Sequence, residues 1–107
     1  MDKYSVYNDI HERLINSTLL AGSEEGALIV GVIGQAIQDA MGLYNSECEK
    51  VYVEGAVDSK LRRKWITRQQ DAINWFKDKG HYSFADMVEI DPTWITHLLR
   101  TKGAVAI

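Results

Sequence analysis

His81–Arg100, with the sequence HYSFADMVEIDPTWITHLLR, contains the only proline of the 107-residue chain and predicts two short helices in succession. Ser83 is placed to cap a first helix, Phe84–Glu89, because its hydroxyl can accept a backbone N–H of the first turn. Asp91 caps a second helix, Pro92–Thr101, whose first residue is the proline, at a position where a missing N–H costs nothing. Because only one or two residues separate the helices, we expect them to cross at a steep angle.

The apolar residues of this stretch fit two helices packed face to face. The inner faces and the turn between them are formed by Phe84, Ala85, Val88, Ile90, Ile95 and Leu98. This spacing resembles the helix-turn-helix of phage repressors, and the resemblance implies that Pro92–Thr101 enters the major groove of DNA. Those proteins usually have glycine before the apolar turn residue, where a left-handed backbone is easiest. This chain has Glu89 there.

A plain helical hairpin that completes a small core would show the same apolar spacing, so two interpretations stay open. If the pair binds DNA, the polar residues of its second helix contact base edges or phosphates, and basic residues nearby contact the backbone. The candidate DNA-binding residues are Thr93, Thr96, His97, Arg100, Lys102, Arg62, Arg63, Lys64 and Arg68. Trp94 is expected in the core and not on this surface.

Charge is unevenly distributed along the chain. Residues 1–57 hold 3 Lys and Arg against 9 Asp and Glu, residues 58–79 hold 7 against 3, and residues 80–107 hold 2 against 3. The net charge of −3 disfavours a nonspecific nucleic-acid binder. The basic segment directly before the helix pair suits a backbone-contacting helix, although a solvated helix face gives the same pattern.

The remaining segments complete an all-α fold, a compact bundle of about five helices. Three-residue and four-residue apolar spacing, capping residues and glycine stops define the other elements. They are a helix at Tyr4–Leu20 ended by Ala21-Gly22, a helix capped by Ser23 and stopped by Gly42, a loop at Tyr44–Val57 that can hold a short extended piece at Val51–Val53, and a helix from Asp58 or Ser59 to Lys79 stopped by Gly80. We expect one domain, residues 1–107, with the helix pair at 81–101.

The second of these helices is apolar on most of its circumference and contains Gly31 and Gly34. Each glycine inside a helix costs up to about 1 kcal/mol relative to alanine. Close approach of another helix, or of the same helix in a second subunit, would compensate. The sequence therefore predicts a central helix, and a homodimer through Ala27–Met41 is one of the two alternatives that it leaves open.

Several classes of protein are disfavoured by the sequence. The three histidines lie far apart, no glycine-rich phosphate loop follows a strand, and no metal-ligand spacing occurs, so we expect a binding protein and not an enzyme, with no cofactor and no metal. The single Cys48 excludes an internal disulfide and fits a reducing cytoplasm. The longest apolar run, Ala27–Gly34, is too short to span a membrane, and the N-terminus lacks the apolar core of a signal peptide.

A second resemblance covers roughly residues 28–98. Its motifs are QAIQDA at Gln35–Ala40, the pair Trp75-Phe76, the single Phe84, and Asp91-Pro92 followed by Ile95. Their order resembles a group of small helical proteins of phages and prophages, which often have Ala-Gly where this chain has Val88-Glu89. The resemblance implies an origin in a phage or mobile element and a location in the host cytoplasm. It implies no activity and no site residues.

Three functions remain open at this stage. The first is a small regulator that binds DNA through the C-terminal helix pair. The second is a phage-encoded inhibitor or adaptor that binds a host protein, with the acidic first half as its surface. The third is a structural or assembly subunit. The sequence identifies neither a DNA site nor a partner.

Overall fold

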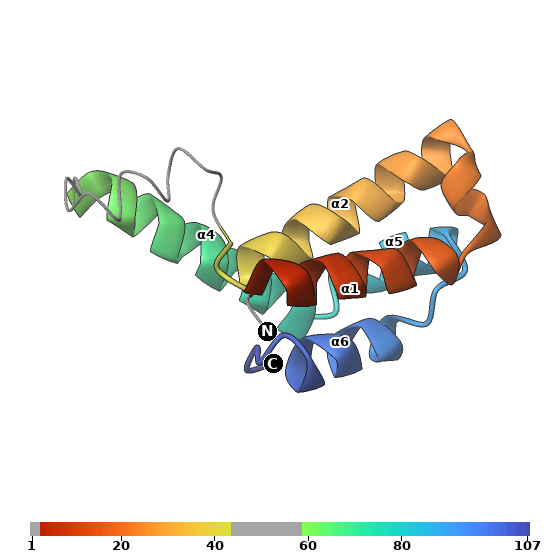
Figure 1. The fold of residues 1–107 in the computed structure, drawn as a ribbon. Helices are drawn as coiled ribbons and strands as arrows, with labels where there is room; N and C mark the ends of the chain where they lie inside the picture. The colour runs from red at the N-terminus through yellow and green to blue at the C-terminus, as the bar shows by residue number, and fades with distance from the viewer. Residues whose placement is uncertain (1–2, 44–58) are drawn as a thin grey trace.

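Helices form the framework of residues 3–43 and 59–107, which the computed structural model describes (Figure 1). The elements are α1 (Lys3–Asn16), the 3-10 helix η1 (Leu19–Gly22), α2 (Glu24–Ala40), α4 (Ser59–Lys77), α5 (Tyr82–Met87) and α6 (Pro92–Thr101). The predicted all-α class is confirmed. The predicted loop Tyr44–Val57, with its extended piece at Val51–Val53, lies outside the described residues. Within the described ranges, no helix has the length and apolar character needed to cross a membrane.

The central element is α2, which contacts α1, η1, α4 and α5. As predicted, Ser23 caps it, and the hydroxyl of Ser23 accepts a hydrogen bond from the backbone N–H of Gly26 at 3.0 Å. Gly42 follows its C-terminus with a φ of 74°. A chain in this left-handed conformation leaves the helix axis sharply, and glycine adopts it without steric penalty.

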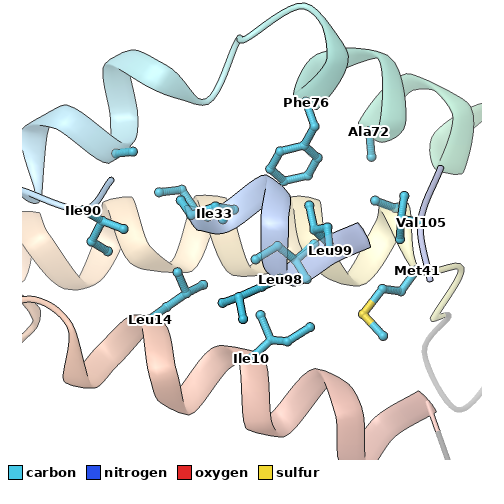
Figure 2. Close-up of a cluster of buried hydrophobic side chains, with 14 of the residues drawn as sticks. Ile10, Leu14, Ile33, Met41, Ala72, Phe76, Ile90, Leu98, Leu99 and Val105 are labelled. Carbon is cyan, nitrogen blue, oxygen red and sulfur yellow. The ribbon is translucent and has the colours of Figure 1, made fainter. Parts of the chain in front are cut away.

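The core lies between α2 and the helices that surround it (Figure 2). Side chains that are no more than 4% exposed come from five helices: Ile10 and Leu14 from α1; Val30, Ile33, Ile37 and Ala40 from α2; Phe76 from α4; Ala85 from α5; and Ile95, Leu98 and Leu99 from α6. Burial of each Val, Ile, Leu or Phe side chain stabilises the fold by about 1.5–3 kcal/mol relative to an exposed one. The C-terminal helix pair is therefore part of the main core and not an appendage.

Several predicted helix boundaries are wrong. The third predicted helix, α4, ends at Lys77 and not at Lys79, and α5 ends at Met87 and not at Glu89. The first helix ends at Asn16 and not at Leu20, because Thr18 takes an extended backbone conformation and caps η1. The fourth predicted helix, α5, begins at Tyr82 and not at Phe84. Ser83 therefore lies inside α5 and does not cap it; the preceding residue His81 occupies the cap position without a side-chain hydrogen bond.

The two glycines of α2 differ in their surroundings. A Cβ atom on Gly34 would lie 3.1 Å from Cδ2 of His11, so this glycine allows α1 to approach α2 closely. A Cβ atom on Gly31 would meet nothing within 4 Å, and Gly31 is exposed. Packing within one described chain therefore accounts for Gly34 but not for Gly31.

Thr18 joins the N-terminal half of the chain to the turn between α5 and α6. Its buried hydroxyl donates a hydrogen bond to the carbonyl of Val88 at 2.6 Å and accepts one from the N–H of Leu20 at 3.1 Å. The carbonyl of Val88 and the N–H of Leu20 each need a hydrogen-bond partner, because buried backbone groups that lose their hydrogen bonds destabilise the fold. One side chain thus fixes η1 against the end of α5.

We expect Thr18→Val to lower the free energy of unfolding by about 1–3 kcal/mol, because the substitution preserves shape but leaves two backbone groups unpaired. Urea denaturation followed by circular dichroism measures the change. Thr101→Val is the matched control, since the hydroxyl of Thr101 is exposed and, among the described residues, bonds to the carbonyl of His97 in its own helix. Equal losses for the two variants would contradict the role given to Thr18.

Candidate nucleic-acid interface

The connection between α5 and α6 is a tight turn with a left-handed residue. The N–H of Ile90 donates to the carbonyl of Ala85 at 2.9 Å, and the N–H of Glu89 donates to that of Asp86 at 3.2 Å. This pair of bonds defines a Schellman motif. Glu89 has a φ of 58°, and Ile90 is buried beyond it. Position 89 therefore has the backbone conformation that glycine usually provides in such turns, although the residue is a glutamate.

The start of α6 is fixed by Asp91, as the sequence predicts. Its carboxylate accepts hydrogen bonds from the N–H and the hydroxyl of Thr93, at 2.9 and 2.7 Å. The Thr93 hydroxyl, followed by its N–H, lowers the pKa of Asp91 below its usual value. A negatively charged cap also interacts favourably with the positive end of the helix dipole. The first turn of α6 is consequently rigid and occupied by an acid.

His81 connects α4, α5 and α6 from inside the core. Its ring lies 4.8 Å from the ring of Phe76 and 5.9 Å from that of Trp75, measured between centroids. Its Nε2 lies 3.2 Å from the carbonyl oxygen of Pro92, so Nε2 carries the hydrogen and donates. Nδ1 is buried and has no hydrogen-bond partner in the described part of the chain. Burial lowers the pKa of His81, because the charged form would lose its hydration.

The outer face of α6 is polar and open. Thr93, His97 and Arg100 are exposed and Thr96 is half-buried, while the opposite face is in the core. Trp94 is half-buried and packs against that core, as expected. The pair is two separate helices joined by four residues, 88–91, and not one continuous rod (Figure 1). The predicted connection of one or two residues was too short.

Several side chains of this face form bonds with nearby groups. The hydroxyl of Thr96 donates to the carbonyl of Thr93 at 2.9 Å. Nε of Arg100 donates to the carbonyl of Ile107 at 2.6 Å. Lys102 forms an ion pair with Asp9 of α1 at 3.0 Å, and Arg13 reaches the same carboxylate oxygen at 3.2 Å. The pKa of Asp9 is lowered, first by the Lys102 hydrogen bond. The border between α6 and α1 is thus a mixed-charge surface.

The basic residues of α4 lie elsewhere. Arg63, Lys64 and Arg68 line a groove of about 760 Å³ between α4 and α2, together with Asp39 and others. Arg68 and Asp39 form an ion pair at 3.0 Å. The side chain of the remaining candidate, Arg62, is outside the described side chains. The candidates with described side chains therefore fall into two groups, one on α6 and its C-cap and one in this groove, and no described contact joins the groups.

Three important residues were missed at the sequence level. Thr18 and His81 act through partners that are distant in the chain, so their roles have no local pattern. Leu99 is fully buried, although the predicted inner face of the second helix had only Ile95 and Leu98. The two adjacent leucines at 98 and 99 were the available signal for a wider buried face.

The comparisons with known proteins identify no relative. No family model, no curated protein and no solved structure matches the chain. Among residues 3–43 and 59–107, no group of three or more His, Cys, Asp or Glu side chains could hold a metal ion. The function is consequently inferred from the geometry of the surface.

Stability is expected to depend on pH through His81. Unfolded, this histidine has the ordinary pKa of 6.5, and folded it has a lower one, so the unfolded chain binds more protons just below pH 6.5. The contribution of His81 to the free energy of unfolding is therefore fully present above pH 6.5. It is lost as the pH falls below 6.5, by at most about 1.4 kcal/mol per pH unit. Urea titrations between about pH 7.5 and 5.5 test this expectation. His81→Gln should flatten the dependence and His97→Gln should not; an unchanged slope in His81→Gln would contradict the assignment.

Glycine at position 89 is expected to stabilise the turn. Glu89→Gly removes the steric penalty of a left-handed non-glycine residue and should raise the free energy of unfolding by about 0.5–1 kcal/mol. Asp86→Gly, inside α5, should lower it by a similar amount, because glycine weakens a helix interior. Thermal and urea denaturation measure both variants. A loss of stability in Glu89→Gly would show that the turn relaxes to another conformation in solution.

Proposed function

We propose that the protein is a small DNA-binding regulator whose helix α6 enters the major groove. The supporting observation is the division of α6 into two sides. Ile95, Leu98 and Leu99 are buried, and the polar side opposite them is not covered by any described helix. A short turn and the Asp91 cap fix the start of this helix relative to α5. The proposed role is binding and not catalysis.

The exposed residues have the spacing that groove binding requires. Thr93, His97 and Arg100 follow each other at four-residue and three-residue steps, so they lie along one side of the helix. From 93 to 100 the helix rises about 10 Å, at 1.5 Å per residue. This length corresponds to about three base pairs at roughly 3.4 Å each. The three side chains can therefore reach successive base pairs.

Arg100 is the best placed of these side chains for base recognition. Its bond to the carbonyl of Ile107 uses only Nε–H. The two terminal nitrogens retain four N–H donors in a planar arrangement. That arrangement suits a bidentate contact with O6 and N7 of guanine, the commonest specific contact in the major groove. The carbonyl bond also restricts the side chain, which reduces the entropy lost on binding.

Charges around α6 favour phosphate contacts at its C-terminal end. Glu89 and the capping Asp91 carry negative charge at the N-terminal end, where they repel a phosphate. Lys102 and Arg13 lie at the other border, both paired with Asp9. Exposed ion pairs contribute at most about 1 kcal/mol, so phosphates can replace Asp9 as their partner. The cations at 62, 63, 64 and 68 of α4 would contribute long-range attraction.

The resemblance to small phage and prophage proteins supports a regulator encoded by a phage or mobile element and acting in the host cytoplasm. We also propose a homodimer through the Ala27–Met41 helix. Its support is an apolar surface: Ile15, Leu19, Leu28 and Val32 are large apolar residues that are at least 40% exposed. The alternative function is an adaptor that binds a host protein through the acidic first half of the chain, and this apolar surface belongs to the same half. Large exposed apolar patches mark binding sites for proteins.

Arg100→Ala is expected to weaken binding to duplex DNA by at least about tenfold, because a bidentate base contact contributes roughly 1–3 kcal/mol. Duplexes are first selected from a random library, and affinity is then measured by fluorescence anisotropy at about 50 mM salt, where phosphate contacts still bind strongly. Lys77→Ala is the control, because it removes the same charge from the exposed C-terminal turn of α4.

Two phosphates bound by Lys102 and Arg13 would give a slope of about −2 for the logarithm of affinity against the logarithm of salt concentration. Absence of binding to any duplex at low salt would overturn the proposal. Equal effects of Arg100→Ala and Lys77→Ala would show that only net charge matters and would overturn the role of α6.

A further inference from the structure

The outward face of α2 is apolar and has no covering helix in the described chain. Leu28 is 71% exposed and Val32 is 41% exposed, and they lie one helical turn apart. Gly31 and Gln35 are exposed on the same side. Burial of Leu28 and Val32 away from water would be favourable. A Cβ atom on Gly31 would meet nothing within 4 Å, so packing within one described chain gives no reason for a glycine there.

A hollow lies beside these exposed side chains. It has a volume of about 160 Å³, lies between α1 and α2, and is lined by His11, Ile15, Ala27, Val30 and Gly31. The absence of a side chain at Gly31 keeps it open. The face thus combines a depression with two adjacent apolar projections, Leu28 and Val32. Such a combination is what a surface needs to pack against a copy of itself, because a two-fold interface is self-complementary.

Opposite charges stand at the two ends of the same face. Glu24 and Glu25 are exposed in the first turn of α2. At the other end, Arg68 is paired with Asp39 but remains 60% exposed. Arg63 and Lys64 line the same groove and are exposed. The N-terminal end is therefore acidic, and the C-terminal end has additional basic groups from α4.

We infer that a second copy of this chain covers the face, with the two α2 helices antiparallel and crossing near Gly31. The inference rests on the proposed homodimer and specifies its interface. The exposed positions 28, 31, 32 and 35 have their midpoint between Gly31 and Val32. A two-fold axis there places Val32 of the second copy level with Gly31 and its hollow. It also places Glu24 level with Asp39 and Arg68 of the second copy, so acidic ends meet basic ends twice.

The antiparallel direction follows from these charges. A parallel pair would bring Glu24 and Glu25 next to their own copies, and like charges at short distance destabilise an interface. It would also align the two helix dipoles. A second copy satisfies the apolar face, the hollow and both charged ends with one symmetry operation.

Sedimentation equilibrium of the full chain tests the interface. The wild-type chain should have the mass of a dimer, and Leu28→Glu should weaken association at least about tenfold, because it buries an unpaired charge between the copies. Helical circular dichroism should stay unchanged, since Leu28 is exposed within one chain. Ile66→Glu is the matched control: Ile66 is 53% exposed on α4 and does not line the groove facing α2, so this variant should remain dimeric.

Cross-linking tests the direction. In a Cys48→Ser background, Gly31→Cys should be joined into a covalent dimer by a short bismaleimide. Glu24→Cys should not, because 15 residues of helix separate the two cysteines by about 22 Å in the antiparallel pair. Cross-linking of Glu24→Cys would overturn the antiparallel arrangement.

The outcomes separate the inference from the proposals on which it rests. A wild-type monomer at all concentrations would overturn both the homodimer and this interface, and would favour a host protein on the α2 face. A dimer that persists in Leu28→Glu would overturn the interface alone. Neither result bears on DNA binding by α6, which the Arg100→Ala titration measures separately.

Discussion

Packing against the inner face of α2 is the constraint on which the rest of this structure depends. This helix contacts α1, η1, α4 and α5, and its buried residues form the centre of the core. Because α5 packs on α2 and the buried side of α6 belongs to the same core, the C-terminal helix pair has a fixed position. Its polar face is outward as a result of this packing. The surface proposed for DNA is thus a consequence of which residues α2 buries.

Three helices end with the same hydrogen-bond pattern but with different residues. The left-handed positions are Gly42 after α2, Lys79 after α4 and Glu89 after α5, with φ values of 74°, 63° and 58°. Only the first is a glycine, so only the first could be recognised from the sequence. At the end of α4, Gly80 has a different role: a Cβ atom there would collide with the indole ring of Trp75. The sequence predicts that Gly80 ends this helix, but the left-handed residue is Lys79, directly before it.

Local signals were sufficient for much of the fold. Ser23, Gly42 and Asp91 act on backbone groups within five residues, so capping rules identify them correctly. The apolar spacing of the helix pair also identified the buried residues at 85, 88, 90, 95 and 98. Thr18 was missed because its partner Val88 is 70 residues away. Apolar periodicity continued past Thr18 and extended the predicted helix too far. Such a boundary is decided by a tertiary contact.

The candidate site was less predictable than the fold. Exposure of Thr93, His97 and Arg100 follows from the amphipathic pattern of α6. The ion-pair partners of the basic residues do not follow from any sequence pattern. Lys102 and Asp9 are 93 residues apart, and Arg68 meets Asp39 only when α4 packs on α2. The predicted cations therefore lie on two separate surfaces, one on α4 and one at the end of α6. Linear charge density predicts that cations are exposed, but not which direction they face.

The buried sides of α2 and α6 belong to the same core, so their outward faces point away from it, and in the view of Figure 1 the two helices lie on either side of α1. This arrangement has a consequence for any dimer that uses the α2 face. The two α6 helices of such a dimer would lie on the far sides of the two joined cores and point away from each other. Such a pair would not read both halves of one palindromic operator, as most repressor dimers do. It would instead hold two DNA segments together, as a tether between distant sites or between neighbouring duplexes.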